Sequence, residues 1–291
     1  SSATGNFSSA SGYKSDAGAQ GATATGAYSS AAGLFSTANG YGSYAKGDLS
    51  TASGAGSYAS GAGATATGSL SVADGAGATA TGYKSYAIGA GATSNGVNSY
   101  ALGDYSTAVG ASAYAIGDNS TALGANSYAT TGATATGVKS NASGAYSMAD
   151  GFASSASGAY STAVGSKSYA KGNYSTATGA YSYAKGKGST ADGFYSRATG
   201  TNSTAAGFYS LASGTGSTAD GAHSIASGRY ATATGYAARA TGAYSTADGF
   251  YSNASGQSSV AMGIYSTASN TQATAIGAFS TASGFDATAV V

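Results

Sequence analysis

The chain has 291 residues, including 48 Gly but no Pro, Cys or Trp, and only 7% of its residues are charged. Eleven basic and ten acidic residues leave a net charge of +1, so no long-range field draws the chain toward nucleic acid or an anionic membrane. The absence of Cys excludes a disulfide framework and a thiolate metal site. Regularly placed Tyr and Phe residues indicate order rather than disorder.

A seven-residue repeat begins at Asn6 and follows the rule x-x-(Ser/Ala)-x-Ala-x-Gly to the end of the chain. Ala19 and Asn270 stand where Gly is expected, and Val291 ends the last repeat. One residue is missing within residues 125–131, and the pattern resumes at Thr131. We therefore expect residues 1–291 to form a single repeat domain.

The repeat predicts β-strands rather than a coiled coil. A coiled coil needs Leu, Ile or Val at two positions of each heptad, whereas the constant positions here are Ser, Ala and Gly. Positions 3, 5 and 7 are small and positions 4 and 6 vary, which is the alternation of a strand with two distinct faces. Gly at position 7, followed by two loosely defined positions, predicts a corner.

The full period is fourteen residues, because position 4 carries Thr in every second heptad and mostly other residues in between. This predicts an all-β parallel solenoid with two short strands per coil and about 21 coils, stacked at the spacing of adjacent strands. One strand of each coil presents a Thr-rich outer face, and the other presents a variable, Tyr-rich outer face.

The interior of such a coil holds only Ser, Ala and Gly, so its apolar burial is small beside the entropy lost on folding. We therefore expect one outer face to pack against other copies of the chain. The Thr-rich face is favoured because Thr is small and suits strands, although Asp150, Asp192, Asp220 and Asp248 interrupt it. The residues predicted to face an oligomer partner are Thr23, Thr37, Thr51, Thr65, Thr79, Thr93, Thr107, Thr121, Val109, Leu123, Val164 and Ile276.

The Tyr-rich face is predicted to be the adhesive one, because Tyr combines apolar area with a polar tip. The alternative interpretation is an aromatic ladder that stabilises the sheet. The residues concerned are Tyr44, Tyr58, Tyr86, Tyr100, Tyr114, Tyr128, Tyr169 and Tyr183. Corner aromatics such as Phe208 and Tyr209 are expected to cover the edges of the narrow interior.

The motifs SYAIG at Ser85, AYAIG at Ala113, STAVG at Ser106, STALG at Ser120 and ATAIG at Ala273 resemble the YadA-like head repeats of trimeric autotransporter adhesins. The resemblance implies a left-handed β-roll with three chains side by side. Thr and Tyr replace much of the Val and Ile that this family favours. No neck, coiled-coil stalk or membrane anchor is visible, and no apolar run is long enough for a membrane span.

No residue is predicted to be catalytic, to bind a cofactor or to bind a metal, and an enzyme is the least favoured class. Ser occurs throughout because the repeat requires it, and the single His, His223, lies at a corner with no Cys or Glu nearby. No nucleic-acid partner is expected.

The leading hypothesis is an extracellular structural or adhesive protein of the bacterial cell surface, either an adhesin head or a surface fibre. Its partners would be copies of itself and a matrix protein, a surface glycan or other cells. One alternative is a self-assembling filament subunit, because both ends stop in repeat phase without a polar cap. Another is an ice-binding solenoid that uses its Thr face, although Asp, Val and Leu interrupt that array.

Overall fold

The computed structural model describes residues 1–291 and shows parallel strands joined by tight corners, without any helix. The chain divides into two compact units, Ser1–Tyr146 and Ser147–Val291, and both are built in the same way. Within each unit, three-residue strands with even numbers, here called Thr strands, alternate with two-residue strands with odd numbers, called Tyr strands. None of these elements is a helix that could span a membrane.

The first unit contains both strand types in strict alternation. Its Thr strands are β2 (Ser9–Ser11), β4 (Thr23–Thr25), β6 (Thr37–Asn39), β8 (Thr51–Ser53), β10 (Thr65–Thr67), β12 (Thr79–Thr81), β14 (Thr93–Asn95), β16 (Thr107–Val109), β18 (Thr121–Leu123) and β20 (Thr134–Thr136). Its Tyr strands are β1 (Ser2–Ala3), β3 (Asp16–Ala17), β5 (Ser30–Ala31), β7 (Tyr44–Ala45), β9 (Tyr58–Ala59), β11 (Val72–Ala73), β13 (Tyr86–Ala87), β15 (Tyr100–Ala101), β17 (Tyr114–Ala115), β19 (Tyr128–Ala129) and β21 (Asn141–Ala142).

The second unit continues the same alternation. Its Thr strands are β22 (Met148–Asp150), β24 (Thr162–Val164), β26 (Thr176–Thr178), β28 (Thr190–Asp192), β30 (Thr204–Ala206), β32 (Thr218–Asp220), β34 (Thr232–Thr234), β36 (Thr246–Asp248), β38 (Val260–Met262), β40 (Thr274–Ile276) and β42 (Thr288–Val290). Its Tyr strands are β23 (Ser155–Ala156), β25 (Tyr169–Ala170), β27 (Tyr183–Ala184), β29 (Arg197–Ala198), β31 (Leu211–Ala212), β33 (Ile225–Ala226), β35 (Arg239–Ala240), β37 (Asn253–Ala254), β39 (Thr267–Ala268) and β41 (Thr281–Ala282).

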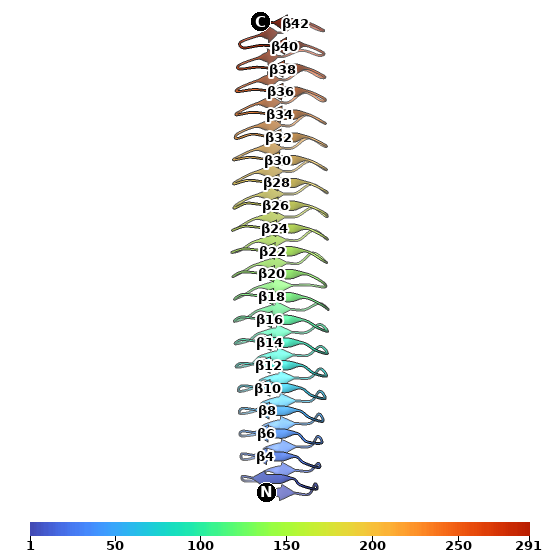
Figure 1. Cartoon of the computed structure of the whole chain (residues 1–291), viewed down its shortest axis with the longest axis vertical. Helices are drawn as coiled ribbons and strands as arrows, with labels where there is room; N and C mark the ends of the chain where they lie inside the picture. Colours follow the sequence, from blue (N-terminus) through green and yellow to red (C-terminus); the bar gives the residue numbers. More distant parts are fainter. The chain divides into compact units, whose positions relative to one another are not determined.

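Within each unit, strands pair in parallel with the strand of their own type in the next coil, as the stacked even-numbered labels of Figure 1 show. Thr65 lies opposite Thr79 and Tyr86 lies opposite Tyr100, fourteen residues apart. The predicted parallel β-solenoid is therefore confirmed. The missing residue is absorbed in the corner after Tyr128–Ala129, because Thr121 pairs with Thr134 and Tyr128 pairs with Asn141, so these strands stay in register.

The interior consists of Ala and Ser, as the repeat predicted. The Ala column at position 5 has no exposed surface along nearly all of the chain. At position 3, a buried Ser donates a hydrogen bond to the carbonyl three residues earlier, as Ser36 Oγ does to Gly33 at 2.7 Å. Ser94 replaces the usual Ala and instead hydrogen-bonds Ser99 across the interior at 2.6 Å. Six interior hydroxyls lack a partner, those of Ser50, Ser161, Ser175, Ser182, Ser189 and Ser224.

The corners hold position 2 of every heptad in the left-handed backbone region. Non-Gly residues there, many of them Tyr, have φ between 52° and 60°. Such a conformation is strained for a bulky residue and persists only where its surroundings hold it. Hydrogen bonds between successive corners provide that support, since Tyr28 donates its N–H to Tyr13 at 2.8 Å and Leu49 donates to Leu34 at 2.8 Å.

Position 7 needs Gly for two different reasons. In heptads that contain a Thr strand, φ lies between +104° and +149°, a region that other residues rarely adopt. In heptads that contain a Tyr strand, φ is not restrictive, but an added Cβ at Gly33 would overlap the carbonyl of Gly47 in the next coil. Both internal exceptions, Ala19 and Asn270, belong to the second class. The first class keeps Gly in every coil until the chain ends at Val291.

Gly40 provides a direct test of this constraint. Its φ is +133° and an added Cβ would lie 2.8 Å from backbone atoms of Gly54. We expect Gly40→Ala to lower the free energy of unfolding by about 2–4 kcal/mol, because it adds both backbone strain and overlap. Urea unfolding followed by circular dichroism measures the change.

Gly42→Ala is the matched control, only two residues away. Gly42 has φ +61° and nothing within 4 Å of an added Cβ. This variant should lose only about 1–2 kcal/mol, because only the left-handed preference opposes it. Equal losses of unfolding free energy in the two variants would contradict the inference that close contact between coils requires Gly at position 40.

Candidate binding faces

The Thr face consists of the outward side chains at positions 4 and 6 of the Thr strands. The eight Thr residues predicted to face a partner, from Thr23 to Thr121, are all half-buried and lie in register in successive coils. Beside them, Val109, Leu123 and Ile276 are 36%, 38% and 40% exposed, and Val164 is half-buried. Within each unit, the Thr face is thus a surface of short outward side chains.

Two of the four Asp residues that interrupt the Thr face, Asp192 and Asp248, accept hydrogen bonds from Thr residues of that face. The hydroxyl of Thr178 donates to the carboxylate of Asp192 at 2.7 Å, and that of Thr234 donates to Asp248 at 2.8 Å. Each bond joins neighbouring coils of the same column. These two carboxylates are exposed and hydrogen-bonded. The hydrogen bonds lower the desolvation free energy of placing these carboxylates beside another chain.

The Tyr face consists of the outward side chains at positions 4 and 6 of the Tyr heptads. Tyr100 lies between Tyr86 and Tyr114, with ring centroids 4.9 Å apart on both sides and planes within 5° of parallel. Tyr44 and Tyr58 stack similarly at 5.5 Å, whereas Tyr169 and Tyr183 are tilted by 57° at 6.4 Å. Five of the eight predicted Tyr residues therefore stack in ladders, namely Tyr44, Tyr58, Tyr86, Tyr100 and Tyr114.

Apolar neighbours of this ladder were not singled out by the sequence pattern. Ile88, Leu102 and Ile116 follow the Tyr strands at position 6 and are 37%, 41% and 37% exposed. Together with Tyr86, Tyr100 and Tyr114 they form a mixed aromatic and aliphatic surface in the first unit. The signal was present in the sequence as the motif Tyr-Ala-(Ile/Leu)-Gly at fourteen-residue intervals.

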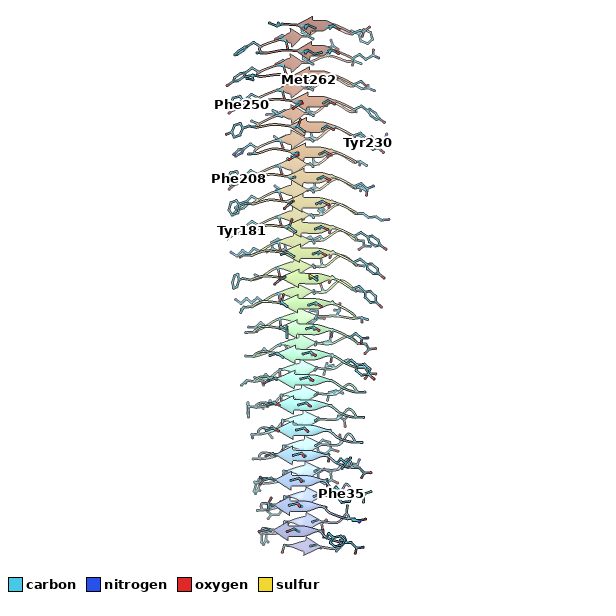
Figure 2. All side chains as sticks on the ribbon, in the orientation of Figure 1. Phe35, Tyr181, Phe208, Tyr230, Phe250 and Met262 are labelled. Atoms are coloured by element: carbon cyan, nitrogen blue, oxygen red, sulfur yellow. The ribbon has the colours of Figure 1, made fainter.

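The corner aromatics do not cover the interior, contrary to expectation. Phe208 and Tyr209 are 46% and 45% exposed, and such side chains stack on one another outside the coil. Figure 2 shows Tyr181, Phe208 and Phe250 on one edge of the second unit and Tyr230 on the other. The close stacking of backbone between coils already closes the corner, so no side chain is needed there.

His223 belongs to one of these corner ladders. Its ring stacks on Tyr209 with a centroid distance of 5.6 Å and planes 5° apart, and it meets Phe208 edge-on at 5.5 Å. His223 therefore takes the place of an aromatic residue in a column. No group of three or more His, Cys, Asp or Glu side chains in the chain is arranged to hold a metal ion.

Comparison with known families identifies the repeat. The YadA head domain repeat matches along most of the chain, over residues 31–57, 45–71, 59–85, 80–105, 101–127, 131–152, 156–182, 184–210, 205–231, 226–252 and 254–280. The chain belongs to the YadA head repeat family. No curated protein sequence matches it. Among solved structures, the collagen-binding domain of the Yersinia adhesin YadA is 26% identical, covering 51% of this chain and 68% of that one, with a TM-score of 0.34.

Membership of the YadA head family confirms the resemblance that the repeat motifs suggested and makes this chain an adhesin-type head domain. In this YadA-type head the two outer faces differ in character. The Thr face is flat and carries short side chains, whereas the Tyr face carries stacked rings, aliphatic side chains and cations. Any contact with another molecule has to use these outer surfaces, because the interior is filled.

Tyr100 tests the stabilising role of the ladder. Because it stacks on two rings, we expect Tyr100→Ala to lower the free energy of unfolding by about 1–3 kcal/mol. Tyr100→Phe keeps both stacked contacts and should lose less than about 0.5 kcal/mol. Urea unfolding of both variants makes the comparison, and a Tyr100→Ala variant as stable as the parent would contradict the ladder.

Proposed function

We propose that the chain is the head of an extracellular adhesin or surface fibre, displayed on a bacterial cell and assembled as a homotrimer. It binds matrix, host or other cells through its outer surface. The observation that carries this proposal is the match to the YadA head repeat over most of the chain. The exposed Tyr, Ile and Leu side chains supply the contact area that an adhesive surface requires.

Within this proposal the Thr face packs against the other two chains and the Tyr face remains accessible to ligands. The half-buried Thr columns and the flanking Val109, Leu123, Val164 and Ile276 are short enough for chains to approach closely. Burial between chains supplies the apolar contact that an interior of Ala and Ser lacks. The Tyr residues from Tyr44 to Tyr183 are then free to meet a partner.

We also propose that residues 1–291 act as one domain. The support is that both units contain the same alternating strands with the same fourteen-residue register. The urea unfolding curve of the Gly40→Ala variant also tests whether the chain is one domain. One shifted transition fits a single domain, whereas two transitions of which only one moves would contradict it.

The oligomeric state is the first test of the proposal. Light scattering should give the mass of three chains for the parent protein. The double variant Thr107→Lys with Thr121→Lys places charges in the proposed interface, so it should dissociate to monomers. Ala32→Lys with Ser60→Lys adds the same charge on the Tyr face and should remain trimeric. A monomeric parent protein would overturn the trimer.

Adhesion tests the role of the Tyr face. Replacing Tyr86 and Tyr114 by Thr removes two rings while keeping a residue that the repeat itself uses there, at Thr267 and Thr281. Attachment of cells to surfaces coated with the variant should fall by more than about half, since aromatic residues dominate binding energy at interfaces. The variant must stay trimeric by light scattering. Unchanged attachment would contradict an adhesive Tyr face.

A further inference from the structure

Charge is sorted between the two faces of the second unit. Four of its Asp residues, Asp150, Asp192, Asp220 and Asp248, all lie in Thr strands. In contrast, five cations lie in or beside its Tyr strands, namely Lys167, Lys171, Lys185, Arg197 and Arg239. Because the chain as a whole has a net charge of only +1, its composition gives no sign of this cationic Tyr face. The face arises because acidic and basic residues lie on opposite faces of the second unit.

Three of these cations, Lys167, Lys171 and Arg197, lie over tyrosine rings in three successive coils. Lys171 Nζ lies 5.3 Å from the ring centre of Tyr183, and the guanidinium carbon of Arg197 lies 5.9 Å from the same ring. Lys167 Nζ lies 5.2 Å from the ring centre of Tyr181 and donates to its hydroxyl at 3.5 Å. These contacts restrict long side chains that would otherwise sample many rotamers.

A depression of about 290 Å³ lies among the side chains of Lys167, Tyr169, Tyr181, Tyr183, Tyr195 and Arg197. It runs between the corner column and the outward column of strands β25, β27 and β29. Its walls combine phenol hydroxyls, which donate and accept hydrogen bonds, with cationic groups. This set of groups fits a ligand that carries both hydroxyls and negative charges.

We propose that this cationic part of the Tyr face binds an extracellular anionic polysaccharide, whose sulfate or carboxylate groups contact Lys171, Lys185 and Arg197. The proposal rests on the proposed function, in which the Tyr face is accessible. Charge-assisted hydrogen bonds to sulfate or carboxylate are the strong contacts, and the Tyr hydroxyls bind the sugar hydroxyls.

The repeat of the solenoid suits an extended polysaccharide. Coils follow one another at about 4.8 Å, the spacing of adjacent strands. This is close to the length of one pyranose unit, so a sugar chain lying along the solenoid meets similar groups in each coil. Lys171 and Lys185 occupy the same position in consecutive coils, so each of these coils supplies one positive charge.

The stacking of the rings argues against a single-stranded nucleic acid as the ligand. Nucleic acids bind such surfaces by stacking bases on free aromatic faces. Here both faces of Tyr195 are covered, by Tyr181 at 4.6 Å and by Tyr209 at 4.9 Å, with planes 4° and 8° apart. At Tyr195 only the ring edge and the hydroxyl remain available, and these serve hydrogen bonding rather than base stacking.

The test uses the full chain and a size-defined heparin octasaccharide in titration calorimetry. We expect binding that weakens as salt is raised. The triple variant Lys171→Ala, Lys185→Ala and Arg197→Ala should bind at least about tenfold more weakly, because three charged contacts are lost. A uronate oligosaccharide without sulfate tests whether carboxylates alone suffice, and neutral dextran should not bind.

A matched control removes the same charge elsewhere. Lys14→Ala, Lys187→Ala and Arg229→Ala alter three cations outside this surface and should change heparin affinity less than about twofold. If the control variant loses as much heparin affinity as the triple variant, the loss comes from net charge alone and the proposed site is overturned. Binding of single-stranded DNA as tight as that of heparin would overturn the choice of ligand.

The remaining outcomes separate this inference from the proposed function. A trimeric protein that supports cell attachment but binds neither heparin nor the uronate oligosaccharide overturns the polysaccharide site alone. Loss of the trimer in the triple variant would instead assign the cations to contacts with a second copy, through its Asp-bearing Thr face. Failure of both attachment and polysaccharide binding would overturn the adhesive Tyr face itself.

Discussion

Contact between the glycine backbones of neighbouring coils is the constraint on which the rest of this structure depends. An added Cβ at Gly33 or Gly47 would overlap the carbonyl of the next coil, so the corners approach as closely as the strands do. Backbone hydrogen bonds therefore continue from the strands through the corners. Each side chain consequently lies directly over its equivalent fourteen residues away. Columns of like residues follow from this geometry.

The same close approach leaves an interior that accommodates only Ala and Ser. The Ser hydroxyls bond locally, as Ser36 does to Gly33, and place few demands on the opposite strand. All larger apolar side chains are displaced to the outside, where Ile88, Leu102 and the Tyr ladders remain exposed. An ordinary domain separates its core from its binding surface. In this head domain the outer columns both stabilise the fold and form the surface that is open to other molecules.

Because outward positions can change without disturbing the interior, one fold carries different surfaces along its length. Residues 86–116 of the first unit present Tyr with Ile and Leu, whereas residues 167–197 of the second unit present Tyr with Lys and Arg. The aromatic column is common to both and holds its neighbours in place by stacking. Variation at position 6, together with Arg197 at position 4 and Lys167 at the corner, then sets whether a stretch is apolar or cationic.

Much of the fold was predictable from the amino-acid pattern, because the alternation of small and variable residues is local and repeated many times. The period, the two strand types, the interior of Ala and Ser and the lost residue before Thr131 all followed from it. Other features depend on distances between residues fourteen apart, which no local pattern reports. These include the left-handed corners, the two classes of Gly that explain Ala19 and Asn270, and the covered ring faces of Tyr195. The grouping of Lys171 and Arg197 around Tyr183 likewise required the stacking of coils, since that stacking alone brings the three side chains together.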